Sequence, residues 1–186
     1  MEELASKASL SDEDVIGLRN SVSCLDLKPI EFPLNKTKIG YIPLIESSQF
    51  TLCVFYLPKG SVLPFHDHPR QYVGLRVLRG ELELESCDVQ SPGRFTVGQK
   101  YEIARSETKI LTSESEVLVV KPDLNNIHEI RSKTEAMFVD YVVPPYGPDR
   151  AITYFSREAD SLTALRERDV DLPMEFHSIH SLVTSR

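Results

Sequence analysis

Two histidines, His66 and His68, stand two residues apart in the segment Phe65-His66-Asp67-His68-Pro69. In an extended chain, side chains at positions i and i+2 point to the same face. The two imidazoles would therefore lie side by side, as a metal ion requires of its ligands. The alternative is a chance surface pair beside a turn, but only 5 histidines occur among 186 residues. The spacing favours a metal site.

A catalytic metal is poorly held by two histidines, so we expect a third ligand. The best candidate is His128, in the apolar-flanked segment Ile127–Ile130. In a strand, His128 and Glu129 face opposite sides, and a buried histidine without a metal is the alternative interpretation. His177 and His180 form another close pair near the C-terminus, where we expect a solvated tail.

The composition fits one globular domain. The chain has 41% hydrophobic residues and a formal net charge of −7, with acidic and basic residues interspersed. This charge argues against a nucleic acid or an anionic membrane as the main partner. No apolar stretch is long enough to span a membrane, and the acidic N-terminus does not resemble a signal peptide. The widely spaced Cys24, Cys53 and Cys87 form no CxxC motif, which predicts a reduced, cytoplasmic location, with Cys53 as a core thiol.

Helical patterns are found toward both ends of the chain. Ser11 and Asp14 resemble a helix cap with its capping-box acid. Arg157–Arg168 carries Leu162 and Leu165 at helical spacing, which predicts a second helix. The chain divides into three parts: an N-terminal helical extension (1–35), a central barrel (36–156), and a C-terminal helical segment and tail (157–186).

Between these ends, short apolar or alternating runs are separated by Gly, Pro and Ser. The run Glu81–Glu85 alternates strictly between glutamate and leucine, which predicts a half-exposed strand with Leu82 and Leu84 inward. Many short strands at such spacing indicate a mostly β fold, either a sandwich or a barrel. The predicted strands are 49–57, 62–65, 72–78, 81–86, 100–103, 116–120, 127–131 and 136–143.

Several segments together resemble the cupin superfamily and, more narrowly, the thiol dioxygenases of the cysteamine dioxygenase and plant cysteine oxidase family. The segments that carry the resemblance are Leu57–Gly60, Phe65–Pro69, Arg79-Gly80, Asn126–Ile130, Asp140–Tyr146 and Tyr154-Phe155. The aspartate followed by Pro-Pro-Tyr is the most specific of them. The resemblance covers about residues 40–156. It implies a mostly β cupin fold, the double-stranded β-helix or jelly-roll barrel, with flanking N- and C-terminal helices.

By this resemblance, His66, His68 and His128 match the iron(II) ligands of the family. Many cupin sites also take a glutamate four or five residues after the histidine pair, where this chain has Tyr72 and Val73. Three neutral imidazoles leave iron(II) its full charge, which suits an anionic thiolate substrate together with dioxygen. Three histidines around zinc would instead suit hydration or hydrolysis.

The resemblance also implies three catalytic residues. Asp140 matches an acid near the iron that pairs with the substrate ammonium group; a surface carboxylate at a strand end is the alternative. Tyr146 matches a tyrosine on the loop beside the cavity, and a structural role at the Pro-Pro turn is equally open. Tyr154 matches a tyrosine that directs its hydroxyl to the iron or the oxygen. Some members carry a cysteine two residues earlier that cross-links to this tyrosine, but this chain has Ile152 there, so we expect no cross-link.

The function that the resemblance implies is an iron(II)-dependent thiol dioxygenase, which uses dioxygen to convert a thiol to a sulfinic acid. The substrate would be cysteamine or the N-terminal cysteine of a protein or peptide. Two other classes stay open: a non-catalytic cupin that binds a small ligand, and a zinc or manganese cupin isomerase or hydrolase. We expect a monomer with no nucleic-acid partner and no membrane partner.

Overall fold

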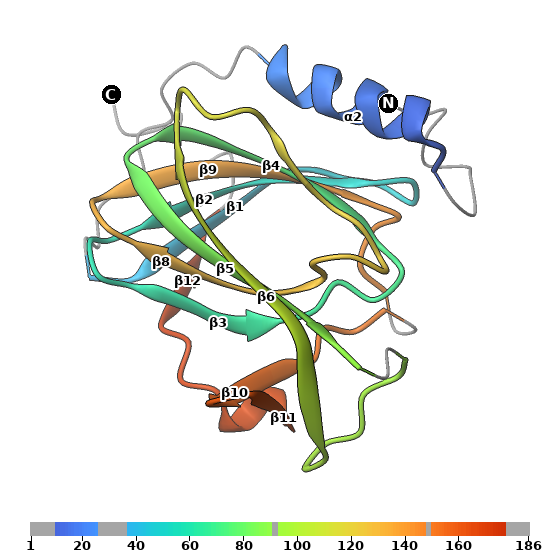
Figure 1. Ribbon diagram of the computed structural model, residues 1–186. Coiled ribbons are helices and arrows are strands. Elements are labelled where there is room, and N and C mark those ends of the chain that lie inside the picture. Colours follow the sequence, from blue (N-terminus) through green and yellow to red (C-terminus); the bar gives the residue numbers. More distant parts are fainter. Residues whose placement is uncertain (1–9, 26–36, 91–92, 148–149, 178–186) are drawn as a thin grey trace.

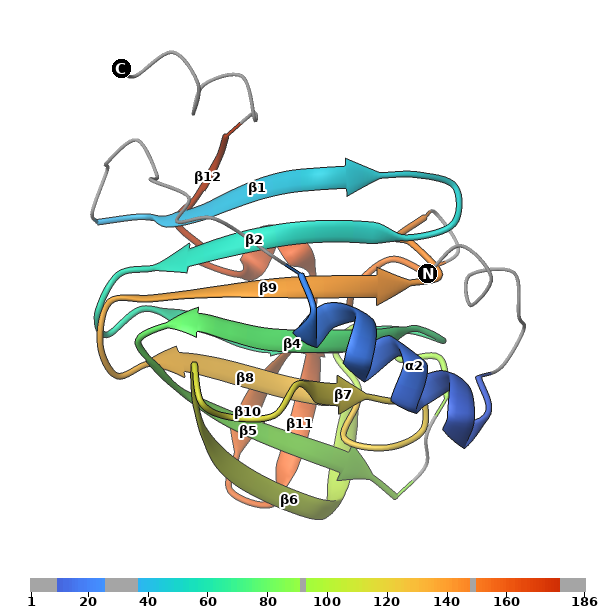
Figure 2. The ribbon, with the colours of Figure 1, turned by 90° about the horizontal axis from the view of Figure 1, so that it is seen from above.

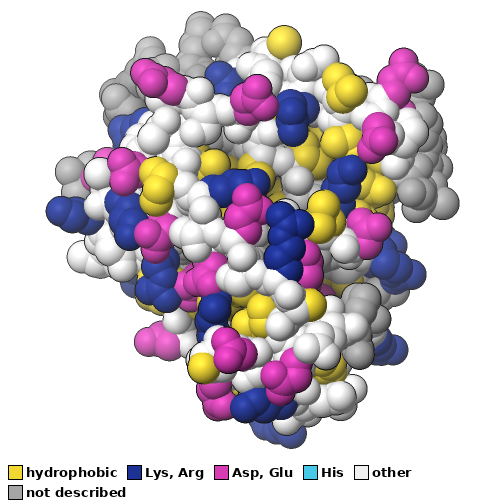
Figure 3. Space-filling model, viewed as in Figure 1, with side chains coloured by type: hydrophobic (Ala, Val, Ile, Leu, Met, Phe, Trp, Pro, Cys, Tyr) yellow, Lys and Arg dark blue, Asp and Glu magenta, His cyan; other side chains and the backbone are white. Residues whose placement is uncertain are grey.

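The computed structural model describes residues 10–25, 37–90, 93–147 and 150–177. These residues form two β-sheets that pack face to face, with one α-helix on the outer face of the first sheet (Figure 1). Within the described ranges, no helix is long and apolar enough to cross a membrane. Side chains of both charges are interspersed over the face drawn in Figure 3.

The first sheet has six strands with β9 near its centre. Their order is β12 (Met174–Phe176), β1 (Ile39–Glu46), β2 (Thr51–Leu57), β9 (Ala136–Val143), β4 (Tyr72–Arg79) and β7 (Leu118–Val120). Every residue of β9 is buried, because one face of this strand packs below the helix and the other faces the interior between the sheets. Asp140 therefore enters the interior from a strand that is paired on both sides.

The helix α2 (Asp12–Ser23) packs on the outer face of this sheet, over β4 and β7 (Figure 2). Its predicted capping box is confirmed: the Ser11 hydroxyl accepts from the Asp14 N–H, and the Asp14 carboxylate accepts from the Ser11 N–H. Leu18 and Val22, one helical turn apart, are fully buried against the sheet. The apolar side of the helix thus covers the outer face of the first sheet over β4 and β7.

The second sheet closes on itself into a small barrel. The order around the ring is β10 (Tyr154–Glu158), β11 (Ser161–Leu165), β6 (Lys100–Thr112), β5 (Glu81–Val89), β8 (Ile127–Ser132) and β3 (Val62–His66), with β10 paired to β3. Leu82 and Leu84 are buried in the core between the two sheets, as their alternation predicts. A separate apolar cluster, which includes Phe65, Ile127 and Phe155, fills the small barrel. β3 and β8 therefore have a core on each side.

The predicted C-terminal helix over Arg157–Arg168 is wrong. This stretch forms most of the antiparallel hairpin of β10 and β11, followed by a short 3-10 turn, η1 (Glu167–Asp169). Leu162 and Ala164 are both buried, a period of two that belongs to a strand. The cause is tertiary: β11 pairs with one end of β6, and that hydrogen-bonding partner cannot be seen from leucine spacing.

Most of the predicted strands are present, although their ends differ. β6 extends far beyond the predicted 100–103, because β5 pairs with it along nearly its whole length. The unpredicted strands β1 and β12 pair in parallel at the edge of the first sheet. The His177 N–H, just after β12, donates to the Tyr41 carbonyl oxygen. His180 and residues 1–9 and 26–36, which include part of the predicted N-terminal extension, lie outside the described residues.

Candidate metal centre

Strand pairing brings the three predicted histidines together. His66 ends β3, His128 lies at the start of β8, and the two are direct cross-strand partners. His68 lies two residues beyond the end of β3. The potential ligand nitrogens of the three side chains all lie within 4.8 Å of one another. Their ring centroids are 4.6 to 5.0 Å apart. Three imidazoles thus converge on one point at the end of β3.

Hydrogen bonds orient these rings. Nδ1 of His66 lies 2.8 Å from the Pro64 carbonyl oxygen, which can only accept, so Nδ1 carries the proton and Nε2 keeps its lone pair. Nδ1 of His68 lies 3.0 Å from the Tyr146 hydroxyl. Nε2 of His68 and Nδ1 of His128 are buried with no hydrogen-bond partner in the described part of the chain. Each ring therefore keeps one nitrogen for a metal.

Burial also keeps the three imidazoles neutral. It lowers the pKa of His66 and lowers the pKa values of His68 and His128 well below the ordinary value. Neighbouring histidines lower the latter two pKa values further. Metals bind the neutral form, and buried nitrogens without partners are costly unless a cation satisfies them. Within the described residues, the ligand cluster consists of these three histidines and no carboxylate. This donor set fits a divalent transition-metal ion.

Two further side chains, Asn126 and Asp67, hold the segments that carry the histidines. The Asn126 amide accepts from the His68 N–H at 2.6 Å and donates to the His68 carbonyl at 3.0 Å. Asp67 accepts from the Thr153 N–H at 2.6 Å, and burial raises the pKa of Asp67 to about 6. Sequence reasoning missed both roles. Asn126 lies two residues before His128, in a segment that carries the family resemblance. Its partner His68 is 58 residues away, so residue spacing could not predict this hydrogen bond.

Asp140 reaches the same interior from β9. Its side chain is 7% exposed and lines a cavity of about 70 Å³ together with His66 and His68. Burial raises the pKa of this carboxyl to about 8, and its Oδ1 has no hydrogen-bond partner among the described residues. The alternative of a surface carboxylate is therefore wrong. A buried acid with an unpaired oxygen beside a metal site can receive the cationic group of a ligand.

Both predicted tyrosines line this cavity as well. Tyr146 follows the cis Val143–Pro144 peptide bond, and its hydroxyl lies 3.0 Å from Nδ1 of His68. Tyr154, the first residue of β10, is a cross-strand partner of His66, with the two ring centroids 6.1 Å apart. Ile152 forms part of the wall. The structure brings these residues to the cavity, and their catalytic roles stay predictions.

The remaining wall of this cavity is apolar and includes Phe55, Leu63, Pro64, Ile130, Leu172 and Met174. Cys53 is the cross-strand partner of Asp140. Its thiol is buried and donates to the Asp140 carbonyl oxygen at 3.7 Å. Burial raises the pKa of Cys53 well above its ordinary value. The prediction of a core thiol at Cys53 is confirmed, and its contact steadies the backbone that carries Asp140.

Comparison with known proteins gives a family for this chain. A family model described as PCO_ADO matches residues 9–178. The chain is 33% identical over 154 residues to a probable 2-aminoethanethiol dioxygenase of Dictyostelium discoideum, covering 77% of this chain and 70% of that protein. It is 30% identical over 121 residues to plant cysteine oxidase 1 of Arabidopsis thaliana, covering 63% and 41% respectively. Among solved structures, an RmlC-like cupin protein of Desulfovibrio desulfuricans shows a TM-score of 0.44 and 20% identity, covering 66% of this chain and 93% of that one.

The fold and the site define a mostly β cupin with a three-histidine metal centre. The chain belongs to the PCO_ADO family, that of cysteamine dioxygenase and the plant cysteine oxidases, because the family model matches nearly its whole length. The family resemblance drawn from the sequence is confirmed. The chain spans less than half of the Arabidopsis relative.

Proposed function

We propose that this protein is an iron(II)-dependent thiol dioxygenase, which converts a thiol R–SH and dioxygen to a sulfinic acid R–SO₂H. The observation that carries this assignment is a cluster of three histidines, two of them buried and one half-buried, without a carboxylate ligand among the described residues, beside a buried acid whose Oδ1 is unpaired. Membership of the PCO_ADO family supports it. The names of the relatives, an aminoethanethiol dioxygenase and a cysteine oxidase, suggest cysteamine or an N-terminal cysteine as substrate.

In this proposal, His66, His68 and His128 hold the metal. Bound iron(II) would supply the redox chemistry that adds both atoms of dioxygen to the thiol sulfur. The protein fixes the ligand rings, since the Pro64 carbonyl and the Tyr146 hydroxyl each hold the Nδ1 of one histidine. The apolar wall keeps bulk water away from the reacting atoms.

Asp140 receives the ammonium group of the substrate. Its raised pKa keeps the carboxyl mostly protonated at neutral pH while no cation is near. A metal cation on the histidines and an ammonium group within about 4–6 Å both favour the carboxylate, so the acid is ionised when metal and substrate are bound. The resulting ion pair holds the amine end of an aminothiol and directs its sulfur toward the histidines.

Tyr154 contributes a hydroxyl donor on another side of the cavity. Burial raises the pKa of its phenol, so the group stays protonated at physiological pH and can donate a hydrogen bond. A donor near the metal would orient dioxygen or the product oxygen atoms. Tyr154→Phe should therefore lower kcat while iron binding is retained.

The test is anaerobic reconstitution with iron(II), followed by oxygen and either cysteamine or a peptide that begins with cysteine. We expect oxygen uptake and a product heavier by one dioxygen molecule. His128→Ala should lose iron, whereas His177→Ala, outside the cluster, should retain it. An iron-loaded protein that oxidises neither thiol would sink the assignment, and zinc- or manganese-dependent hydrolysis or isomerisation would replace it with another class.

A further inference from the structure

Gln71 is a fully buried polar side chain next to the metal centre that the proposed function leaves without a role. Its exposed fraction is 0%. It lies three residues after His68, at the end of a tight turn, and its N–H donates to the His68 carbonyl oxygen at 3.1 Å. Arg70, at the third position of this turn, has a φ of +58°. The turn thus leads the chain directly from a candidate metal ligand into β4, which begins at Tyr72.

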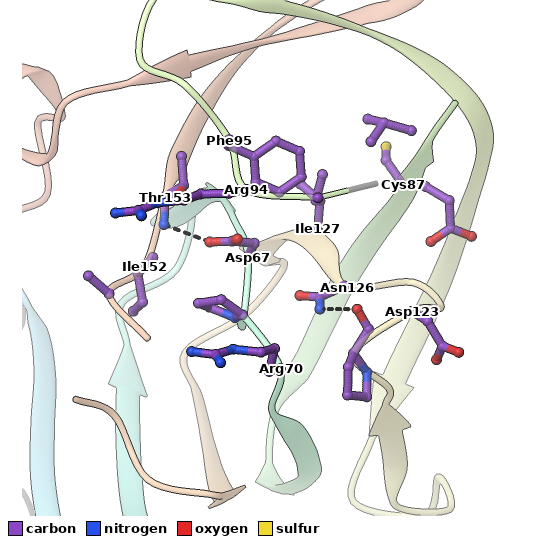
Figure 4. Close-up of a pocket in the computed structure, with 16 residues that line it drawn as sticks. Asp67, Arg70, Cys87, Arg94, Phe95, Asp123, Asn126, Ile127, Ile152 and Thr153 are labelled. Carbon is purple, nitrogen blue, oxygen red and sulfur yellow. Dashed lines mark hydrogen bonds between the residues drawn. The ribbon is translucent and has the colours of Figure 1, made fainter. Parts of the chain in front are cut away.

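Gln71 lines neither of the two cavities near this turn. The cavity of about 70 Å³ beside the histidines, which we call the metal cavity, is lined by His68 but not by Gln71. A second cavity, of about 760 Å³, is lined by Pro69 and Arg70 of the same turn, again without Gln71 (Figure 4). A side chain outside both cavities does not touch a substrate, so any role of Gln71 at the centre is exerted through other residues.

The Gln71 amide holds the loop that carries Tyr146. Nε2 of Gln71 donates to the Pro144 carbonyl oxygen at 3.0 Å. A carbonyl oxygen can only accept, so the NH₂ group of the amide faces Pro144. The pairing of β4 with β9 ends at Tyr72 and Val143. The Gln71 side chain therefore continues the contact between these two segments one residue beyond the last pair of the strands.

These hydrogen bonds form a closed ring that includes a ligand of the metal centre. Tyr146 lies two residues after Pro144, and its hydroxyl is 3.0 Å from Nδ1 of His68. The His68 carbonyl oxygen is bonded to the Gln71 N–H, and the Gln71 amide is bonded to Pro144. The loop is thus tied to His68 at two places, by the Tyr146 hydroxyl at the ring and by Gln71 at the backbone. The second tie sets where the first one can form.

Packing alone does not require an amide at this position. Oε1 of Gln71 is buried with no hydrogen-bond partner among the described residues, and an unpaired buried acceptor destabilises the folded chain. Methionine has a side chain of the same length and fills buried space without a strong polar atom. The hydrogen bond that the Gln71 side chain does make is the one to the loop of Tyr146.

We propose that Gln71 is a positioning residue of the metal centre, whose amide holds the Tyr146 loop so that the tyrosine hydroxyl stays in contact with His68 Nδ1. This inference rests on the three-histidine centre of the proposed function, but it does not depend on the reaction or on the substrate. A hydrogen-bond partner at the second nitrogen fixes the orientation of a ligating imidazole. Loss of the Gln71 amide should therefore act on metal binding through Tyr146.

Gln71→Met removes the amide and keeps the length of the side chain. In an anaerobic competition with a chelator, iron(II) affinity should fall about tenfold, as for other groups that orient a ligand. Tm of the metal-free protein should stay within about 4 °C of the wild type, because the lost bond to Pro144 and the removal of the unpaired Oε1 oppose each other. Gln49→Met, the same change at an exposed position before β2, is the control and should alter neither quantity.

A double-mutant cycle with Tyr146→Phe tests the route of the effect. If Gln71 acts through the tyrosine hydroxyl, Gln71→Met should change iron(II) affinity less than about twofold once that hydroxyl is absent. A further loss of about tenfold in the Tyr146→Phe background would overturn the proposal, because the two residues would then act independently. A role of Gln71 in packing alone would not produce this coupling.

Gln71→Asn is a second variant for the case in which methionine prevents folding. It keeps the amide but is one methylene shorter, which withdraws the NH₂ group from Pro144, and it should show the same loss of iron(II) affinity and the same coupling to Tyr146. Wild-type affinity in either folded variant overturns the proposal and leaves the dioxygenase assignment standing. Iron(II) binding that shows the coupling, in a protein that oxidises no thiol, supports the role of Gln71 and refutes the proposed function instead.

Discussion

Replacing Asn126 by alanine tests whether the loop before β8 positions the metal centre. The Asn126 amide accepts from the His68 N–H at 2.6 Å and donates to the carbonyl oxygens of His68 at 3.0 Å and Pro122 at 2.7 Å. Alanine removes all three bonds. It leaves the backbone of His68 without these partners, although Asn126 itself does not line the metal cavity.

The size of the effect follows from these contacts. A buried polar group left without a partner costs about 1–3 kcal/mol. Because Asn126 is half-buried, water can replace part of the lost bonding, and we expect about 2 kcal/mol for the substitution. For a chain of 186 residues, about 2 kcal/mol lowers Tm by about 4–8 °C. Loss of a group that orients a ligand typically weakens metal binding about 10- to 100-fold.

Both quantities can be measured on the same preparation. Calorimetry of the metal-free protein gives Tm, and anaerobic competition with a chelator gives the iron(II) affinity. Asn20→Ala, at an exposed position on α2, is the control and should change neither strongly. Asn126→Asp keeps the acceptor for the His68 N–H and should lie between alanine and wild type. If Asn126→Ala loses stability but keeps wild-type iron affinity, the reasoning about positioning is wrong.

Four further substitutions test other parts of the structure. Tyr146→Phe removes the hydroxyl 3.0 Å from His68 Nδ1 and should weaken iron(II) binding about tenfold in the chelator competition; unchanged affinity would contradict this role. The pKa of Asp140 is raised from 3.8 to about 8 on folding, so its contribution to stability is present at low pH and is lost as pH rises from about 4 to about 8. In the metal-free protein, Asp140→Asn should therefore lose less unfolding free energy than the wild type between about pH 4 and about pH 8. If the unfolding free energies of wild type and variant fall in parallel over this range, the prediction is wrong. Gly80→Ala should cost about 3 kcal/mol or more in chemical denaturation, because φ is +81° and the new Cβ would lie 2.3 Å from a backbone oxygen. Gly60→Ala has a φ of +82° but no atom within 4 Å and should cost only about 1–2 kcal/mol; equal losses would contradict the steric argument.

Features that depend on near neighbours could be predicted from the sequence. The capping box at Ser11 needs only a residue three positions later. The inward orientation of Leu82 and Leu84 follows from strand alternation. The spacing of His66 and His68 correctly predicted that both join one cluster, although His68 lies beyond the end of β3 and its backbone is held by Asn126. The first two predictions held because no distant segment could change the periodicity of the chain.

Features that depend on distant partners could not be predicted in this way. Leu162 and Leu165 suit a helix by spacing, but pairing with β6 places this segment in a strand. The bonds from Asn126 to the His68 backbone join segments 58 residues apart. The cavity of about 760 Å³ forms where the loop after β3, the end of β5 and the loop after it, the loop before β8 and the segment before β10 meet.

The sequence by itself determined the types of the candidate ligands, the close spacing of His66 and His68, and the family resemblance. Only the tertiary structure decided that His128 joins them, because the register of β3 with β8 sets His66 opposite His128. A slip of one residue would turn His128 to the other face of its strand. The register is set by how the apolar clusters on both sides of β3 and β8 pack. The residue spacing within either strand does not reveal this packing.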